Sequence, residues 1–194
     1  MTEYVLSIDP GLSTGVALLS YGEDSPVELV EGWQFTGGVA GLIQWVERYY
    51  RGPSWGWQFS PGGRPYFPVR VVAEKFTARN TRGFSYTTAS LEPLRGEGAL
   101  IALGLMPDYT PKEKRWRDPK LQYLVGGKDL ADKKKRQHKF LKDNGFYRTN
   151  KDFPDSPLKD GADDFRSAAS HGLASLAREL HHKPTFELLS SWEG

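Results

Sequence analysis

The sequence predicts a mixed α/β fold in which one sheet has helices on both faces. Strand patterns dominate the first half of the chain, a pair of helical patterns occupies the middle, and the chain closes on a long helix with one apolar stripe. This order of elements is typical of a layered α/β architecture. With 194 residues, the chain has the length of one domain, so we expect residues 1–194 to form a single domain.

Three strands are predicted near the N-terminus. Residues 4–8 form an apolar run that ends at Asp9-Pro10-Gly11, and residues 15–19 form a second run after a short turn. Apolar runs separated by such a turn predict a β-hairpin. Residues 27–35 predict the third strand.

A later strand is predicted over residues 69–73, whose β-branched side chains favour burial, and Glu74 follows it directly. Residues 105–109 predict another short strand. Between the early and the later strands, residues 52–68 are rich in Gly, Pro and aromatic side chains, which predicts a loop insertion. Two acids, Asp9 and Glu74, therefore stand at strand ends.

Four segments predict helices. Residues 160–180 carry apolar side chains at steps of three or four, which predicts a helix with one core face. Residues 41–49 predict a shorter helix of the same kind. Residues 87–104 predict a kinked helix with close packing, because Pro93 and three glycines interrupt the pattern. Residues 129–144 predict a basic helix.

Composition excludes several kinds of site and environment. The chain has no cysteine, so disulfides and thiolate metal sites are excluded and any metal must be held by oxygen or imidazole ligands. No apolar stretch approaches the roughly 20 residues of a membrane helix. The N-terminus has no basic leader. We therefore expect a soluble intracellular protein without a membrane partner.

Charge is distributed unevenly along the chain. Residues 112–142 hold twelve Lys or Arg against four Asp or Glu, whereas residues 1–49 hold one Arg against seven acids. A basic segment in an otherwise acidic or neutral chain suits the phosphate backbone of a nucleic acid. The alternative is a solvated helix face.

Acids recur at three places that a fold can bring together. Asp9 ends the first strand, Glu74 follows a later one, and Asp160 with Asp163 or Asp164 lies at the start of the final helix. Mg²⁺ prefers oxygen ligands and takes few carboxylates per ion, so four carboxylates can seat two ions. Two ions about 4 Å apart suit phosphodiester hydrolysis. Each acid also has a structural alternative: Asp160 as a helix cap with Asp163 as its capping-box partner, Asp9 as a turn residue and Glu74 as a surface acid.

These motifs resemble the RuvC-type Holliday junction resolvases of the RNase H-like superfamily. Residues 7–15 resemble the family's opening Ile-Asp-Pro-Gly hairpin, residues 72–74 its second acidic strand, and residues 160–163 its closing Asp-x-x-Asp helix. Residues 94–105 resemble its Gly- and Ala-rich helix, and residues 125–134 its basic stretch. The order and the spacing of the acidic motifs agree as well.

The resemblance implies an RNase H-like fold, with a five-stranded mixed sheet that begins with antiparallel hairpin strands and has helices on both faces. It implies an endonuclease that resolves Holliday junctions, and other branched DNA, by two-metal-ion hydrolysis. Symmetric nicks would leave 5′-phosphate and 3′-hydroxyl ends. Two features depart from the family pattern: segment 52–68 is longer, and Phe76 is not at the usual spacing after the second acid. Because these departures put the choice of substrate in doubt, we include forks and flaps as further expected substrates.

The resemblance also assigns roles to residues. Asp9, Glu74, Asp160 and Asp163 would hold two Mg²⁺ ions, for which Mn²⁺ would substitute. Asp164 rivals Asp163, since both lie beside Asp160 on a helical wheel. Lys133 would act near the scissile phosphate, and the neighbouring Lys134 and Lys135 are alternatives for this role.

The implied partners are branched DNA and a second copy of the chain. Symmetric nicks need two sites related by a two-fold axis, so we expect a homodimer through residues 87–104. The protein would then lie in the cytoplasm with the nucleoid, or in the host cytoplasm if it is viral. Basic, polar and aromatic candidates for DNA contact, for which loop or helix-face packing is the alternative, are Arg79, Asn80, Arg82, Phe84, Tyr86, Lys114, Arg115, Arg117, Lys133, Lys134, Lys135, Arg136 and Lys139.

Two other functions stay open on the sequence. One is an RNase H-like nuclease that acts on flaps, forks or RNA–DNA hybrids, and the other is a catalytically silent module that binds branched DNA. Actin-fold ATPases open with a similar Asp-x-Gly loop, but they need two related domains, for which 194 residues are too few.

Overall fold

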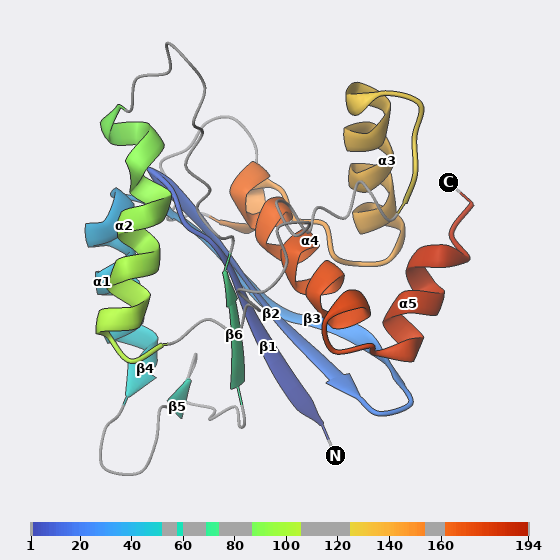
Figure 1. Ribbon diagram of the computed structural model, residues 1–194, viewed down its shortest axis with the longest axis horizontal. Helices are drawn as coiled ribbons and strands as arrows, with labels where there is room; N and C mark the ends of the chain where they lie inside the picture. Colours follow the sequence, from blue (N-terminus) through green and yellow to red (C-terminus); the bar gives the residue numbers. More distant parts are fainter. Residues whose placement is uncertain are drawn as a thin grey trace.

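The computed structural model describes residues 2–51, 58–59, 69–73, 87–105, 125–153 and 162–193 (Figure 1). All structural statements refer to these residues. Their elements follow in the order β1 (Glu3–Asp9), β2 (Ser13–Gly22), β3 (Ser25–Thr36), α1 (Gly38–Tyr49), β4 (Tyr50–Arg51), β5 (Gln58–Phe59), β6 (Val69–Ala73), α2 (Thr88–Ala102), α3 (Leu130–Asp143), the 3-10 helix η3 (Asn150–Asp152), α4 (Asp163–Arg178) and α5 (Lys183–Ser190).

The main sheet has the strand order β3-β2-β1-β6. Strand β2 pairs antiparallel with both β1 and β3, and β6 pairs parallel with β1. The predicted mixed sheet with an N-terminal hairpin is confirmed. The prediction of five strands is wrong for the described residues, where this sheet has four strands. The fifth strand was expected at residues 105–109, of which only Leu105 is described.

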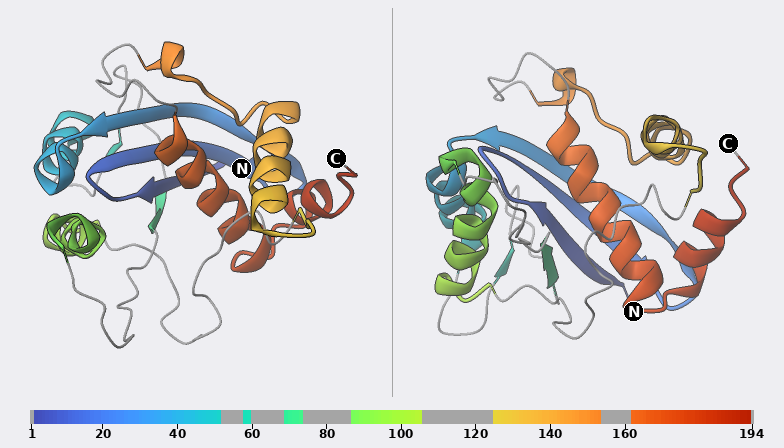
Figure 2. Two further views of the ribbon diagram at one scale, coloured as in Figure 1. Left: turned by 90° about the horizontal axis from the view of Figure 1, so that it is seen from above. Right: turned by 45° about the horizontal axis from the view of Figure 1, so that its top comes forward.

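The two faces of the sheet are covered by different helices, as Figures 1 and 2 show. Leu6 and Ile8 of β1 belong to the core cluster that contains Leu42 of α1. Val5 belongs to a second cluster, which contains Leu173 of α4. Because side chains alternate between the faces of a strand, β1 has its even-numbered residues towards α1 and α2 and its odd-numbered residues towards α4.

The loop predicted at residues 52–68 contains a short strand. Residues Gln58–Phe59 form β5, which pairs antiparallel with β4 in a separate two-stranded sheet. The other residues of this segment lie outside the described residues. A two-residue strand gives too short a period-2 pattern to be recognised among Gly, Pro and aromatic residues.

Helix α5 was not predicted, because the last helix was expected to run from 160 to 180. In the structure α4 ends at Arg178, and His181 has a φ of 50°, which turns the chain. The new helix has Pro184 in its first turn, where a proline suits a helix start. His182 fixes it to the β2–β3 hairpin, because its Nε2 lies 2.8 Å from the carbonyl oxygen of Gly22.

The other helices lie close to their predicted positions. Helix α1 was expected over residues 41–49 and α2 over residues 87–104, and both are present with small changes at their ends. Helix α3 matches the expected basic helix at residues 129–144. None of the helices in the described part of the chain is long and apolar enough to cross a bilayer.

Candidate active site

Asp9 lies at the end of β1, on the face of the sheet that α4 covers. It pairs in register with Gly15 of β2. Ser7, two residues earlier, lies under α4, since a Cβ added to Gly172 of α4 would be 3.0 Å from the Cβ of Ser7. Alternate residues of a strand share a face, so Asp9 is also on this side. Its side chain is half-buried.

Helix α4 begins directly against this end of the sheet. A Cβ added to Gly15 would lie 2.0 Å from the carbonyl carbon of Asp164, 2.1 Å from its oxygen and 2.3 Å from the nitrogen of Phe165. Only glycine leaves room for the helix backbone at this distance. Because Gly15 is the register partner of Asp9, the first turn of α4 comes to the strand end that carries Asp9.

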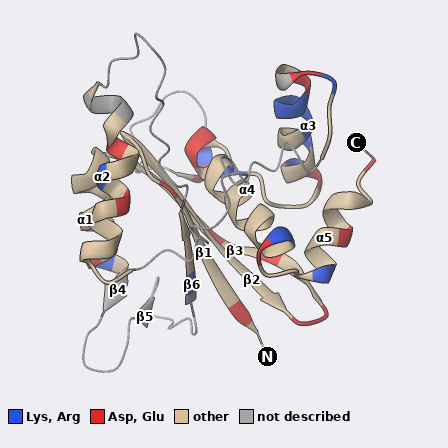
Figure 3. Cartoon of the chain, in the orientation of Figure 1, with Lys and Arg blue, Asp and Glu red and all other residues tan. Residues whose placement is uncertain are grey.

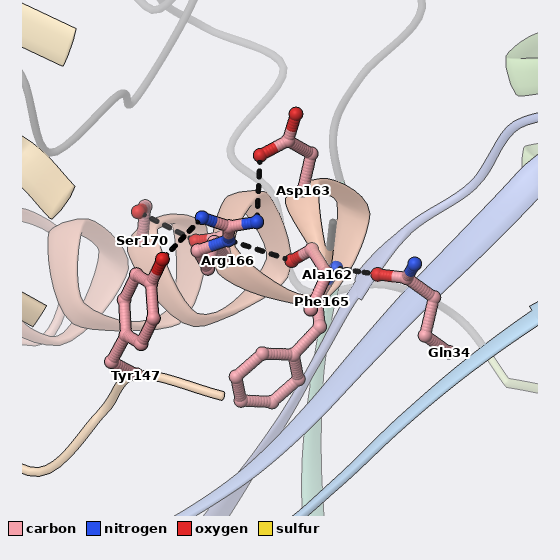
Figure 4. Close-up of polar contacts among 7 residues, drawn as sticks. All are labelled: Gln34, Tyr147, Ala162, Asp163, Phe165, Arg166 and Ser170. Carbon is pink, nitrogen blue, oxygen red and sulfur yellow. Dashed lines mark hydrogen bonds and ion pairs between the residues drawn. The ribbon is translucent and has the colours of Figure 1, made fainter. Parts of the chain in front are cut away.

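The N-terminus of α4 is capped from a distant strand. Its own N-cap residue is Ala162, whose side chain makes no capping hydrogen bond. Instead, Oε1 of the buried Gln34 accepts a hydrogen bond of 2.9 Å from the backbone nitrogen of Phe165 (Figure 4). Gln34 of β3 also pairs with Gly15. Gly15 and Gln34, which are register partners on β2 and β3, therefore both contact the start of α4. Gly15 leaves room for the helix backbone, and Gln34 caps the helix.

We expect Gln34→Ala to lower the free energy of unfolding by about 1–3 kcal/mol, because it leaves a buried N–H of α4 without this acceptor. Denaturant unfolding followed by circular dichroism measures the loss. Gln44→Ala makes the same chemical change at an exposed position of α1 and should change stability by less than about 0.5 kcal/mol. Equal effects of the two substitutions would contradict the capping role.

Two acids lie in the first turn of α4. Asp163 is exposed, and its Oδ1 lies 3.0 Å from Nη2 of Arg166. Asp164 is half-buried, and burial raises the pKa of its carboxyl group, while a hydrogen bond with the Ser13 side chain lowers it and the charge of Asp163 raises it. Both negative charges are favourable at a helix N-terminus.

The structure also bears on the capping-box alternative. Asp163 is the first residue of α4, so its alternative role as the third residue of a capping box is wrong. Asp160 lies outside the described residues.

A buried arginine holds Asp163 in place. The Arg166 side chain is only 9% exposed, against 56% for Asp163. Its Nε donates a hydrogen bond of 3.0 Å to the carbonyl oxygen of Ala162, and its Nη1 donates one of 2.7 Å to the Tyr147 hydroxyl (Figure 4). The guanidinium carbon lies 4.8 Å from the centre of the Tyr147 ring. Three contacts with two residues, Ala162 and Tyr147, therefore constrain the guanidinium besides the carboxylate.

Helix α3 lies beside α4. Gln137 of α3 donates a hydrogen bond of 2.5 Å to the hydroxyl of Ser170. Burial lowers the pKa of His138 below its ordinary value, and the nearby charge of Arg166 lowers it further, whereas Asp163 opposes the shift. The positive charge of Lys134, one turn earlier, also lowers it. The hydrogen bond from Gln137 thus places this side of α3 against α4.

Lys133 packs against the turn that precedes α3. Asp129 caps the helix by accepting a hydrogen bond of 2.9 Å from the nitrogen of Asp132. Gly127 has a φ of 138°, a backbone conformation that favours glycine, and a Cβ added to it would lie 2.6 Å from Cγ of Lys133. The stem of Lys133 is therefore partly enclosed, and its role near the scissile phosphate stays a prediction.

The basic residues of α3, visible in Figure 3, have different surroundings. Lys134 and Lys135 are exposed. Arg136 and Lys139 both lie over the ring of Trp192, at 5.1 and 5.3 Å from its centre. Cations packed on an aromatic ring have part of their interactions satisfied within the chain. We therefore expect Lys134 and Lys135 to contribute more to phosphate contact.

Many predicted site residues lie outside the described residues, and their roles stay predictions. Among the described residues, no group of three or more His, Cys, Asp and Glu is arranged to hold a metal ion. The predicted set of four ligands includes Glu74 and Asp160, which lie outside the described residues. The predicted residues without a description are Glu74, Asp160, Arg79, Asn80, Arg82, Phe84, Tyr86, Lys114, Arg115 and Arg117.

Sequence reasoning missed Gln34, Arg166 and Tyr147, which hold the first turn of α4. No clear signal for them was present in the sequence, because Asp160 was available as a helix cap until the structure placed the helix start at Asp163, after an alanine that cannot cap it. A helix without its own cap must find one elsewhere in the fold if its N-terminus is buried. The sequence does not say which strand provides it.

Comparisons with known proteins add one structural likeness. No family model matches the chain, and no curated protein matches it. The chain is similar to a solved structure described as RuvC of T. thermophilus in complex with a Holliday junction substrate, with 13% identical residues and a TM-score of 0.43. The alignment covers 92% of this chain and 96% of that one. A likeness at this level does not establish the family.

Proposed function

We propose that the chain is a metal-dependent endonuclease with an RNase H-like fold, which cuts branched DNA and acts mainly on four-way junctions. The observation that carries the proposal is the contact between the first turn of α4 and Gly15, the register partner of Asp9. It brings acids from opposite ends of the sequence to one end and one face of the sheet. The mixed sheet agrees with the fold that the sequence motifs imply.

The donor set at this strand end fits divalent cations of the Mg²⁺ class, which prefer oxygen ligands. Asp9 and Asp163 are the described members of the proposed set, and Glu74 and Asp160 would complete it. Two bound Mg²⁺ or Mn²⁺ ions would supply Lewis-acid chemistry for phosphodiester hydrolysis. The carboxylates would bind and orient the ions.

The register of β6 supports the place of Glu74 in this set. Ala73, the last residue of β6, pairs in parallel with Ile8. Glu74 follows Ala73 directly in the sequence, as Asp9 follows Ile8, and this order agrees with Glu74 as a member of the proposed set.

The basic helix α3 is the proposed contact surface for the phosphates of the substrate. Lys134 and Lys135 are exposed on α3, and α3 lies beside the helix that carries Asp163. Lysine side chains contact phosphates as point charges and supply affinity without reading the base sequence. A substrate recognised by its backbone is read by its shape, which agrees with selection of a branched structure.

Nicking assays test the proposed function. We expect the protein to nick a mobile four-way junction in Mg²⁺, at symmetric positions with 5′-phosphate ends, and not to act without a divalent cation. An RNA–DNA hybrid, a flap and a fork of matched sequence are the comparison substrates. If the protein cut the hybrid preferentially, the proposed substrate would be an RNA–DNA hybrid and not a four-way junction. Junction binding without cutting of any substrate would identify a silent binding module and overturn the proposal.

Helix α2 is the proposed dimer surface. Leu94 and Ile101, two turns apart on one side of this helix, are 47% and 44% exposed. Between them, a Cβ added to Gly98 would meet nothing within 4 Å, whereas one added to Gly96 would lie 2.7 Å from Pro10. The side of α2 with Gly96 is thus covered, and the side with Leu94 and Ile101 presents apolar groups around a small residue. Symmetric nicking would use a second copy on this side.

We expect the double substitution Leu94→Glu with Ile101→Glu to convert a dimer into a monomer, because it places charges at the centre of the proposed apolar contact. Sedimentation velocity measures the change. Phe186→Glu is the matched control, since Phe186 of α5 is a similarly exposed apolar residue at 53% outside α2. A monomeric wild-type protein, with and without a junction, would contradict the dimer.

A further inference from the structure

We propose that Arg166 is a positioning residue of the acidic site, which orients the Asp163 carboxylate towards a divalent cation. This inference rests on the proposed function. Carboxylates that bind metals usually accept a hydrogen bond from a second residue, which fixes their orientation. Arg166 is such a partner, with its Nη2 3.0 Å from Oδ1 of Asp163 (Figure 4). The proposal assigns the other oxygen, Oδ2, to the cation.

Arg166 is suited to this role because its own position is fixed. The side chain is buried, and its hydrogen bonds to Ala162 and Tyr147 fix the guanidinium independently of Asp163. Asp163 itself is more than half exposed. Without a partner, an exposed aspartate exchanges between rotamers, and ordering it on metal binding would cost entropy. A rigid guanidinium removes much of this cost before the ion arrives.

Helix stability alone does not explain an arginine at this position. Arg166 is the fourth residue of α4, and a positive charge near a helix N-terminus opposes the helix dipole. Burial of a charge adds a desolvation cost. An arginine at this position orients the Asp163 carboxylate, whereas a neutral residue of similar size would not orient it.

Tyr147 connects this arrangement to the basic helix. It follows α3 in the chain, and its ring lies edge-on to His138 of α3, with 6.3 Å between the ring centres. Its hydroxyl accepts the hydrogen bond from Nη1 of Arg166. Tyr147→Phe would remove this bond and keep both the ring and the charge of Arg166. Arg166→Lys would keep the charge and remove the planar fork.

The test measures Mn²⁺ binding by electron paramagnetic resonance, for the protein alone and for its complex with a four-way junction. We expect Arg166→Lys to weaken Mn²⁺ binding roughly ten- to hundred-fold and Tyr147→Phe to weaken it less, within the range seen when partners of metal ligands are replaced. Nicking by both variants should recover as the Mn²⁺ concentration rises. Arg148→Lys is the control, since Arg148 binds backbone carbonyl oxygens in the same segment and should leave the affinity unchanged.

The outcomes separate this inference from the proposed function. Wild-type protein that binds no Mn²⁺, either alone or with the junction, would overturn the proposed function and the inference with it. Normal wild-type binding, with Arg166→Lys and Tyr147→Phe losing thermal stability but no affinity, would overturn the inference alone and make Arg166 a structural residue. Tighter Mn²⁺ binding by Arg166→Gln than by wild-type protein would also overturn it, because Arg166 would then act as a competing charge.

Discussion

Asp9→Asn is expected to lower Mg²⁺-dependent nicking of a four-way junction by on the order of 10³-fold, while junction binding stays within about three-fold of wild type. The substitution keeps the size of the side chain and removes its charge. A neutral amide oxygen is a weaker ligand for a hard cation than a carboxylate. Binding should persist because phosphate contacts, which the basic residues would supply, determine affinity for DNA. Single-turnover nicking and a gel-shift titration measure the two quantities.

Asp24→Asn provides the matched control for this experiment. Asp24 is exposed in the turn between β2 and β3, beyond the end of β2 that lies away from Gly15. The same loss of charge therefore occurs in the same sheet but away from the proposed site. Its nicking rate should equal that of wild type. If Asp9→Asn cut junctions at the wild-type rate, Asp9 would be a turn residue, and the nuclease proposal would lose its first ligand.

The strand that carries Asp9 was predictable because its pattern is local. Residues 4–8 form an apolar run, and a fully buried strand needs such a run. The Asp-Pro-Gly sequence that follows marks a turn by residue type alone. The structure places β1 at Glu3–Asp9 with β2 antiparallel to it, so both the element and its end were readable from neighbouring residues. The same holds for β6, which matches its predicted residues.

The way α4 is held could not be predicted, because it depends on residues far apart in the chain. Gln34 reads in the sequence as one polar residue in a strand, and its acceptor role exists only once β3 lies under the helix. Arg166 reads as a break in the apolar stripe of the last helix. Its burial makes sense only when Tyr147 and Asp163 approach it from two directions. Tertiary contacts of this kind leave no periodic signal.

The end of α4 shows an intermediate case. The apolar stripe continues to Leu180, so periodicity alone extends the helix to that residue. The signals against it were a proline at position 184 and the histidines before it, which together permit a turn and a new helix start. A positive φ at His181 carries the turn. This conformation is uncommon outside glycine, although histidine adopts it more often than most other residues.

Among glycine-to-alanine changes at the described residues, Gly15→Ala should have the largest effect on the fold. The added carbon would meet the α4 backbone at 2.0–2.3 Å, and a backbone cannot rotate away as a side chain can. Strand β2 cannot yield either, because β1 and β3 hold it on both sides. We expect a loss of about 3 kcal/mol or more in the free energy of unfolding, beyond the usual cost of overpacking. Nicking should fall with it, since α4 would leave the strand end.

Two further glycines make this experiment a graded series, measured by denaturant unfolding at one protein concentration. A Cβ added to Gly32 would lie 2.2 Å from the ring of Phe165, and because a ring can shift, Gly32→Ala should cost less, about 1–3 kcal/mol. At Gly98, inside α2, the same change meets no atom of its own chain within 4 Å and should stabilise the monomer by roughly 0.5–1 kcal/mol, since alanine favours helix. If Gly15→Ala were tolerated as well as Gly98→Ala, α4 would not rest on β2, and the proposal that Asp9 and Asp163 share a site would lose its structural basis.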